Sequence, residues 1–186
     1  MATPDWNQIP RPENDGAADH LHPDVPFPSI ALPSTSGHQV DVSALPGLTI
    51  LFCYPRTAAP GEVVPADWDA IPGARGCTPQ ACSFRDAAAV LASLGVQTVL
   101  GCSTQSTEYQ RELKERTRLG YEILSEAEYA LIEAMGLPTF EWEGRRLMKR
   151  LTMAVEGGKV VKVWYPVFPP DRSAEEVVQW LKGGRK

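Results

Sequence analysis

Two cysteines within residues 76–86 carry the most evident chemistry of the chain. Cys77 and Cys82 lie five residues apart, at the predicted start of a helix. A helix N-terminus presents unpaired backbone N–H groups and the positive end of the helix dipole, and both favour a thiolate over a thiol. Because the thiolate is the form that attacks an electrophile, this arrangement predicts redox chemistry at Cys77.

The spacing of the two cysteines constrains how they react with each other. Thr78 is the predicted N-cap, Pro79 suits the first turn, and an alanine-rich run extends the helix to about residue 94. Five helical residues separate two Cα atoms by roughly 8.7 Å, whereas a disulfide requires less than about 7 Å. A bond between Cys77 and Cys82 therefore requires the first turn or two of the helix to unwind.

The length and charge of the chain indicate one domain with few electrostatic partners. The chain has 186 residues, 43% of them hydrophobic, which suits a single domain at residues 26–186. Residues 1–25 are rich in proline and are expected to form a flexible tail, or an arm lying over the domain. The formal charge of -5 gives no reason to expect nucleic acid or a membrane as partner.

The expected cellular setting follows from the absence of targeting patterns in the sequence. Neither a secretory signal nor an apolar run long enough to cross a membrane is recognised, so we expect a cytoplasmic protein. In that compartment four cysteines are expected to be reduced or redox-cycling rather than a structural disulfide framework.

Hydrophobic patterning predicts strands that alternate with helices after an N-terminal hairpin at residues 29–42. The strands expected after the hairpin are residues 48–54, 96–102, 121–124, 147–155 and 160–166. The helices expected are residues 77–94, 108–118, 126–135 and 173–182, the last capped by Ser173. This order predicts an α/β protein of thioredoxin-like architecture, with a mixed central sheet flanked by helices and an N-terminal hairpin extension.

The other cysteines and the histidines do not indicate a metal or hydrolase site. Cys53 and Cys102 lie in apolar strands, where cysteine commonly serves as a small hydrophobic residue. His20, His22 and His38 all precede the predicted core, which argues against a histidine-activated thiol hydrolase and against a zinc site.

Residues 76–86 belong to a longer pattern that resembles a known family. The stretch GCTPQACSFRD is preceded by a hydrophobic strand ending in Tyr54-Pro55 and followed by GCST at 101–104 and RLTM at 150–153. From about residue 26 to 181 the chain resembles a peroxiredoxin, specifically of the peroxiredoxin Q or bacterioferritin-comigratory-protein group.

The resemblance implies a thiol-dependent peroxidase that needs no metal, flavin or haem. Cys77 would be the peroxidatic cysteine that attacks a hydroperoxide, and Cys82 would be the resolving cysteine that forms an intrachain disulfide with it. Thioredoxin or a glutaredoxin-like protein would reduce that disulfide. Arg150 matches the family arginine that stabilises the thiolate and the peroxide oxygens, and the group implies a monomer or weak dimer.

One position departs from the family pattern. The family places Thr or Ser three residues before the peroxidatic cysteine, and here that position is Ala74. Pro55 lies 22 residues before Cys77 instead of 7, so about 15 residues appear inserted, in the loop of residues 56–72. We expect Thr57 to supply the hydroxyl group, with Thr78 as the rival.

This departure leaves a second hypothesis open. The chain could be a non-enzymatic redox sensor or interaction module, in which the same disulfide changes a surface that a partner binds. A general disulfide oxidoreductase is disfavoured because it would use a C-x-x-C spacing.

Overall fold

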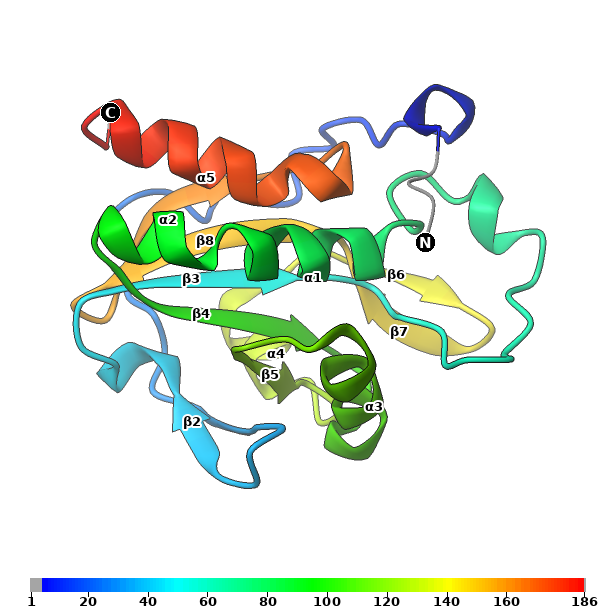
Figure 1. Ribbon diagram of the computed structural model, residues 1–186, viewed down its shortest axis with the longest axis horizontal. Helices are drawn as coiled ribbons and strands as arrows, with labels where there is room; N and C mark the ends of the chain where they lie inside the picture. The colour runs from blue at the N-terminus through cyan, green and yellow to red at the C-terminus, as the bar shows by residue number, and fades with distance from the viewer. Residues whose placement is uncertain (1–4, 186) are drawn as a thin grey trace.

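A computed structural model of the chain describes residues 5–185 and has a five-stranded sheet at its centre (Figure 1). The strand order is β5-β4-β3-β8-β9. Strands β3, β4 and β5 are parallel, whereas β8 and β9 continue the sheet antiparallel. These strands are β3 (Leu48–Cys53), β4 (Val96–Ser103), β5 (Glu122–Ser125), β8 (Leu151–Glu156) and β9 (Lys159–Trp164). The predicted mixed sheet is thus confirmed.

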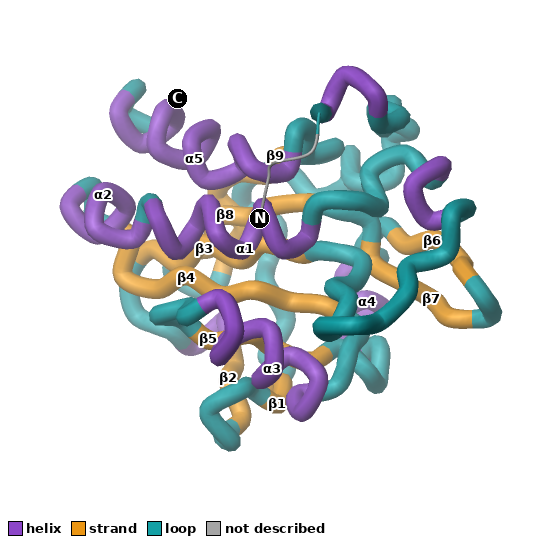
Figure 2. The backbone as a smooth tube through the Cα atoms, turned by 45° about the vertical axis from the view of Figure 1, so that its right-hand side comes forward, coloured by secondary structure: helices purple, strands orange, loops and turns teal. Residues whose placement is uncertain are grey.

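Helices cover both faces of this sheet. Every residue of the central strand β3 is buried as a consequence. Ile50 and Phe52 face a cluster formed with α1, α2, α3 and α5, whereas Leu51 and Cys53 face a second cluster that includes α4. Helices α1 and α5 run side by side over the first face (Figure 2). The helices are α1 (Cys77–Asp86), α2 (Ala88–Ser93), α3 (Thr107–Thr117), α4 (Ala130–Met135) and α5 (Ser173–Lys182). Among residues 5–185, no helix is long and apolar enough to cross a membrane.

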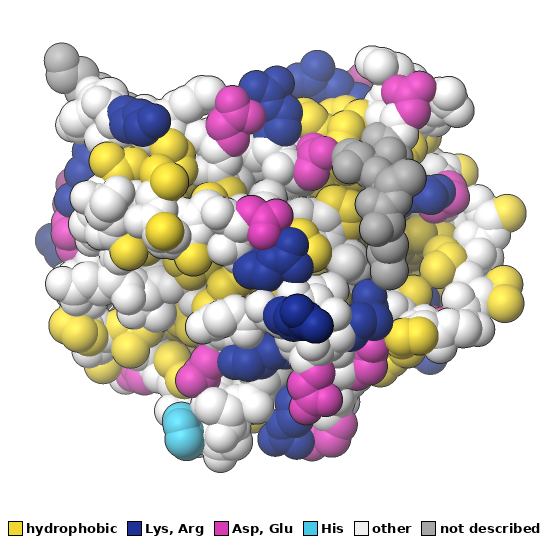
Figure 3. Space-filling model, in the orientation of Figure 1, with side chains coloured by type: hydrophobic (Ala, Val, Ile, Leu, Met, Phe, Trp, Pro, Cys, Tyr) yellow, Lys and Arg dark blue, Asp and Glu magenta, His cyan; other side chains and the backbone are white. Residues whose placement is uncertain are grey.

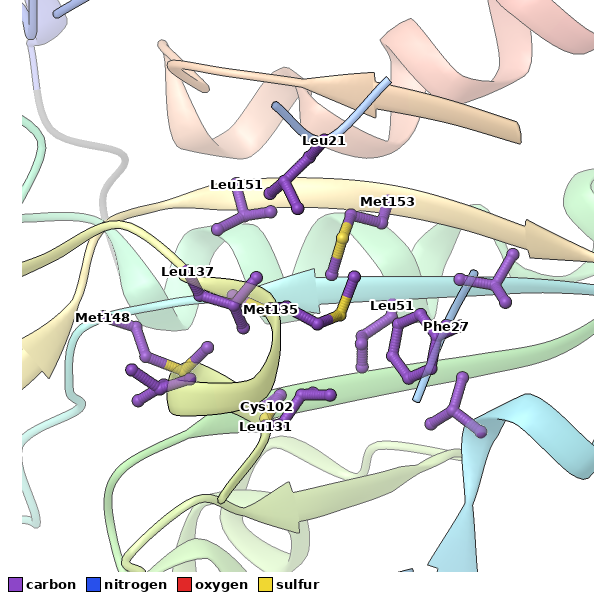
Figure 4. Close-up of a cluster of buried hydrophobic side chains, with 14 of the residues drawn as sticks. Leu21, Phe27, Leu51, Cys102, Leu131, Met135, Leu137, Met148, Leu151 and Met153 are labelled. Carbon is purple, nitrogen blue, oxygen red and sulfur yellow. The ribbon is translucent and has the colours of Figure 1, made fainter. Parts of the chain in front are cut away.

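The N-terminal part of the chain packs on the domain. Strands β1 (Ala31–Pro33) and β2 (Gln39–Asp41) form the predicted antiparallel hairpin. Before it in the chain, Leu21 is buried in the second cluster beside Leu151 and Met153 (Figure 4). Residues 1–4 lie outside the described part of the chain.

The prediction of one continuous strand at residues 147–155 is wrong, because the strand is interrupted at Lys149 and Arg150. Its first part is β7 (Arg145–Met148), which leaves the central sheet and pairs with β6 (Thr139–Trp142) in a hairpin that the sequence analysis did not expect. Its second part is β8. The interruption turns Arg150 into the protein interior, where it becomes buried.

Two helix boundaries also differ from the prediction. The helix expected from residue 126 begins at Ala130, because the buried carboxylate of Glu126 accepts hydrogen bonds from the N–H groups of Leu131 and Ile132. The helix expected over residues 77–94 is divided into α1 and α2 at Ala87.

The inserted loop of residues 56–72 is anchored by aromatic packing. It contains a short 3₁₀ helix, η3 (Trp68–Ala70), whose Trp68 packs edge-on against Trp142 of β6 at a centroid distance of 4.8 Å. The Arg56 guanidinium lies over both rings, 5.7 and 5.2 Å from their centroids. This packing fixes the start of the loop, where Thr57 lies, next to the N-terminus of α1.

Candidate active site

Cys77 is the first residue of helix α1, and the residue that caps the helix is glycine. Gly76 is the N-cap with φ of 106°, a left-handed conformation that favours glycine, so the prediction of Thr78 as N-cap is wrong. Thr78 instead lies in the first turn. Cys77 is 4% exposed and is therefore buried. As the first residue of α1 it also lies at the positive end of the helix dipole.

Arg150 is the charged partner of this thiol. Its Nη2 donates to Cys77 Sγ at 3.2 Å and to the carbonyl groups of Gly73, Ala74 and Arg75 at 3.2–3.3 Å. The side chain comes from the break between β7 and β8 and is 3% exposed. The structure thus brings Cys77 together with the arginine that the sequence motif indicated, across 73 positions of the chain.

The second contact of Arg150 is with a neutral side chain, which the sequence analysis missed. Gln80 is fully buried one turn after Cys77, and its Oε1 accepts a hydrogen bond from Arg150 Nη1. Its Nε2 donates to Ser173 Oγ at 3.3 Å, and Ser173 shares a hydrogen bond with Thr152 at 3.1 Å. The prediction that Ser173 caps α5 is therefore wrong, because Ser173 lies inside the helix and serves this network.

This network leaves the charge of Arg150 without a carboxylate. Among residues 5–185, the hydrogen-bond acceptors of Arg150 are three carbonyl groups, one amide and the Cys77 sulfur. A buried cation is costly unless an anion accompanies it. The Cys77 thiolate is placed to be that anion.

Cys82 lies on the same helix and is also a free thiol. It is half-buried and lines the same cavity as Cys77. The volume of this cavity is about 700 Å³. Both cysteines are helical, so the separation expected from the sequence applies to the structure, and the helix must open before the two sulfur atoms can bond.

Thr57 lines this cavity as well, but its hydroxyl has another partner. Thr57 is buried, its Oγ1 donates to Gln105 Oε1 at 3.3 Å, and its backbone N–H and carbonyl bond the same side chain at 2.8 and 3.0 Å. In the described part of the chain the hydrogen-bond partners of Cys77 Sγ are the Ala74 carbonyl and Arg150, with no hydroxyl among them. The structure therefore brings Thr57 to the cavity but not into contact with Cys77.

Arginines surround the mouth of the cavity although the chain is acidic overall. The lining includes Arg56, Arg75, Arg85 and Arg116. Arg75 and Arg85 are paired with Asp69 and Asp86 at the surface, and neither side chain is among the hydrogen-bond partners of Cys77 Sγ in the described residues. Basic side chains interspersed with acidic ones are visible near the middle of the face shown in Figure 3.

The remaining pair of cysteines lies in the core, as predicted. Cys53 and Cys102 are register partners on β3 and β4 and are fully buried. The neighbouring Cys53 thiol and burial raise the pKa of Cys102 well above its ordinary value. Over residues 5–185 no group of His, Cys, Asp and Glu side chains could hold a metal ion.

Comparison with known proteins identifies the family of the chain. The sequence matches the Redoxin family over residues 22–178. Peroxiredoxin Bcp of Escherichia coli K12 is 26% identical over 163 residues, covering 83% of this chain and 92% of that protein. Peroxiredoxin Bcp of Bacillus subtilis is 27% identical over 164 residues, covering 83% and 91%.

Solved structures show the same fold. Peroxidoxin BcpB from Mycobacterium tuberculosis has a TM-score of 0.72 at 26% identity and covers 90% of this chain and 100% of that chain. Peroxiredoxin Q from Xanthomonas campestris has a TM-score of 0.66 at 21% identity, covering 84% and 92%, and supports the fold alone.

The fold and the family together define a thioredoxin-like thiol peroxidase, and the chain belongs to the Redoxin family. Within that family the relatives to which it is similar are peroxiredoxins of the Bcp, or peroxiredoxin Q, group. The resemblance drawn from the motifs and the predicted thioredoxin-like architecture are both confirmed.

Proposed function

We propose that this peroxiredoxin reduces hydrogen peroxide and organic hydroperoxides in a two-cysteine cycle that begins at Cys77. The observation that carries the proposal is the 3.2 Å contact between Arg150 Nη2 and Cys77 Sγ at the N-terminus of α1. The thiolate attacks the distal oxygen of the hydroperoxide, a sulfur–oxygen bond forms, and the O–O bond breaks. The leaving oxygen takes a proton and departs as water or an alcohol, and Cys77 becomes a sulfenic acid.

Arg150 stabilises charge at two stages of this step. Before attack its guanidinium accompanies the thiolate, and during attack its fixed donors are placed to stabilise charge on the breaking O–O bond. Because Gln80 is neutral, no carboxylate competes with the thiolate for this cation. Gln80 thus orients the guanidinium without neutralising it.

Cys82 completes the cycle by resolving the sulfenic acid. Its sulfur attacks Cys77 sulfur, a disulfide forms and water leaves, after the first turn of α1 has opened. An external dithiol, thioredoxin or a glutaredoxin-like protein, then supplies two electrons by thiol–disulfide exchange. The half-buried position of Cys82 on the cavity wall supports this role.

Thr57 is the proposed source of the hydroxyl group that Ala74 lacks. In the substrate-free protein its hydroxyl donates to Gln105 at 3.3 Å, a long bond that a peroxide oxygen could replace. Gln105 holds the Thr57 backbone through two further bonds, so the hydroxyl can exchange partners while the residue stays at the cavity.

Stopped-flow tryptophan fluorescence tests this cycle. The reduced protein is mixed with hydrogen peroxide beside the Cys77→Ser and Cys82→Ser variants. We expect a rapid change in the wild type, no reaction in Cys77→Ser, and a sulfenic acid that persists in Cys82→Ser. Added thioredoxin, with its reductase and NADPH, should sustain turnover in the wild type only.

A redox sensor is the second candidate, because no hydroxyl contacts Cys77 in residues 5–185. In that case the thiol would react with peroxide no faster than a free cysteine, and the disulfide would change the binding of a partner protein. A reaction as slow as that of a small-molecule thiol would favour the sensor over the peroxidase.

A further inference from the structure

The N-terminal arm contacts the protein at the site itself. Its first described element is a 3₁₀ helix, η1 (Trp6–Gln8). Trp6 Nε1 donates to Asp171 Oδ2 at 2.9 Å, and its ring meets that of Phe168 edge-on at 6.0 Å. Asp171 belongs to η4 (Pro170–Arg172), a short 3₁₀ helix that packs on α1.

The Trp6 ring lies directly on the backbone that carries Cys77. A Cβ atom at Gly76 would be 2.7 Å from Trp6 Cη2 and 2.7 Å from Pro170 Cγ, so the tryptophan and the proline enclose this glycine. Pro12 contacts Gly73 in the same way, at 3.3 Å from a Cβ placed there. The arm thus covers both ends of the turn whose carbonyl groups bond Arg150.

The arm is also fixed beyond the turn. Asp15 pairs with Lys149, the neighbour of Arg150, and accepts a 2.7 Å hydrogen bond from the Tyr165 hydroxyl. Leu21 is buried in the core. With anchors after it along the chain, Trp6 is held against Gly76 rather than resting there as a free end.

This contact bears on the step in which the helix opens. Cys77 cannot reach Cys82 until the first turn of α1 unwinds, and unwinding moves Gly76 away from Trp6. Trp6 therefore stabilises the form in which Cys77 faces Arg150, and the form that makes the disulfide must lose its contact. We propose that Trp6 is a positioning residue that holds the first turn of α1 folded and thereby slows formation of the Cys77–Cys82 disulfide. This inference rests on the proposed two-cysteine cycle.

Trp6→Ala, Trp6→Phe and a matched control, Gln8→Ala, test the proposal. Gln8 is an exposed residue of the same 3₁₀ helix, and its side chain bonds only the neighbouring Asp5 among residues 5–185. Hydrogen exchange of residues 73–82 is measured in the reduced proteins. Rapid mixing with hydrogen peroxide then separates sulfenic acid formation from disulfide formation.

In Trp6→Ala we expect exchange in residues 73–82 and disulfide formation to accelerate about tenfold, corresponding to about 1.4 kcal/mol. Sulfenic acid formation should stay within about twofold of the wild type, because the Trp6 side chain bonds Asp171 and is not among the residues that line the cavity of Cys77. The fraction over-oxidised to sulfinic acid at excess peroxide should fall, because resolution competes with a second peroxide. Trp6→Phe keeps the ring and loses the bond to Asp171, so it should fall between wild type and Trp6→Ala.

Unchanged exchange and unchanged disulfide formation in both Trp6 variants would overturn the inference, as would the same acceleration in Gln8→Ala. If Trp6→Ala does not fold, Trp6→Phe decides by the same two readouts. If the wild type forms no sulfenic acid, the proposed function fails, and the exchange comparison still decides whether Trp6 holds the turn.

Discussion

The two pairs of cysteines in this protein lie in opposite surroundings. Cys77 and Cys82 lie on a helix that begins at a cavity, and Cys77 contacts a buried guanidinium. Cys53 and Cys102 lie side by side on two central strands, with apolar side chains around them. Burial does not distinguish the peroxidatic candidate from the core pair, because Cys77 is 4% exposed and Cys53 and Cys102 are both 0% exposed.

The difference lies in what accompanies each sulfur atom. At Cys77 the N-terminus of α1 and the Arg150 guanidinium present positive charge to the sulfur. At Cys102 a second thiol and burial raise the pKa and favour the thiol. We therefore expect reactivity in this fold to depend on the charge next to a buried sulfur and on its access to a cavity, and not on the degree of burial.

The largest contrast is expected from removing the sulfur atoms themselves. Cys77→Ser should abolish peroxide consumption, whereas Cys53→Ala and Cys102→Ala should keep it near the wild-type value, because neither residue lines the cavity. Steady-state peroxide consumption with a thiol reductant measures this. A core variant that loses activity while remaining folded by circular dichroism would break the comparison.

Removal of the guanidinium should have the next largest effect. Arg150→Ala should lower the rate of Cys77 oxidation by about 10²–10³-fold, the range typical of a lost electrostatic stabiliser of a transition state. Arg146→Ala is the matched control, because Arg146 bonds Glu133 and Thr139 and does not contact the site. Equal rates in the two variants would contradict the role of Arg150.

Giving Arg150 a carboxylate partner should make Cys77 more like a core thiol. In Gln80→Glu the new carboxylate would compete with the Cys77 sulfur for the guanidinium, and we expect Cys77 oxidation to slow about tenfold, or about 1.4 kcal/mol of transition-state stabilisation. Stopped-flow mixing with hydrogen peroxide measures this rate. Gln179→Glu, at the exposed face of α5, is the control for the added charge.

The hydroxyl group of the cavity should have an effect of similar size. Thr57→Val should reduce the rate of Cys77 oxidation about tenfold, in keeping with the loss of one hydrogen bond to a charged group. Thr57→Ser should retain activity. A loss in Thr78→Val and none in Thr57→Val would instead assign the hydroxyl to Thr78.

The smallest effect is expected on protein stability, through the pH dependence of the free energy of unfolding that Cys102 contributes. The pKa of Cys102 is raised in the folded protein. The protonated thiol therefore makes its full contribution to the free energy of unfolding at pH values below the pKa of a thiol in the unfolded chain, about 8.5. The free energy of unfolding should then fall as the pH rises above that value. Urea unfolding of the wild type and Cys102→Ala between pH 7 and 10 measures this, and equal slopes in the two proteins would rule the contribution out.

The sequence predicted the parts of the site that local patterns determine. The helix that begins at Cys77 and the central strands β3, β4 and β5 follow from hydrophobic periodicity. A short motif indicated Arg150, although the strand predicted over it is interrupted there. Thr57 was inferred from a missing hydroxyl, and the structure brings it to the cavity but bonds it to Gln105.

The remaining parts depend on contacts between distant residues. In the sequence, local propensity does not distinguish Gln80 from other helical residues. Its role follows from its hydrogen bond with Arg150, which lies 70 positions away at the break between β7 and β8. Trp6 lies in a proline-rich segment that composition describes as a tail or an arm without naming its contacts, and its partner Asp171 is 165 positions away. Local propensity carries no information on such pairs, although a polar residue three positions after a reactive cysteine was an available signal for Gln80.

Direct identification of the oxidised sulfur tests the central claim that Cys77, and neither of the two core cysteines, is the reactive thiol. The Cys82→Ser protein is reacted with one equivalent of hydrogen peroxide, quenched with dimedone at successive times and mapped by peptide mass spectrometry. The account predicts one adduct, on Cys77, formed faster than on a free cysteine. An adduct on Cys53 or Cys102, or labelling of Cys77 no faster than a free cysteine, would contradict it.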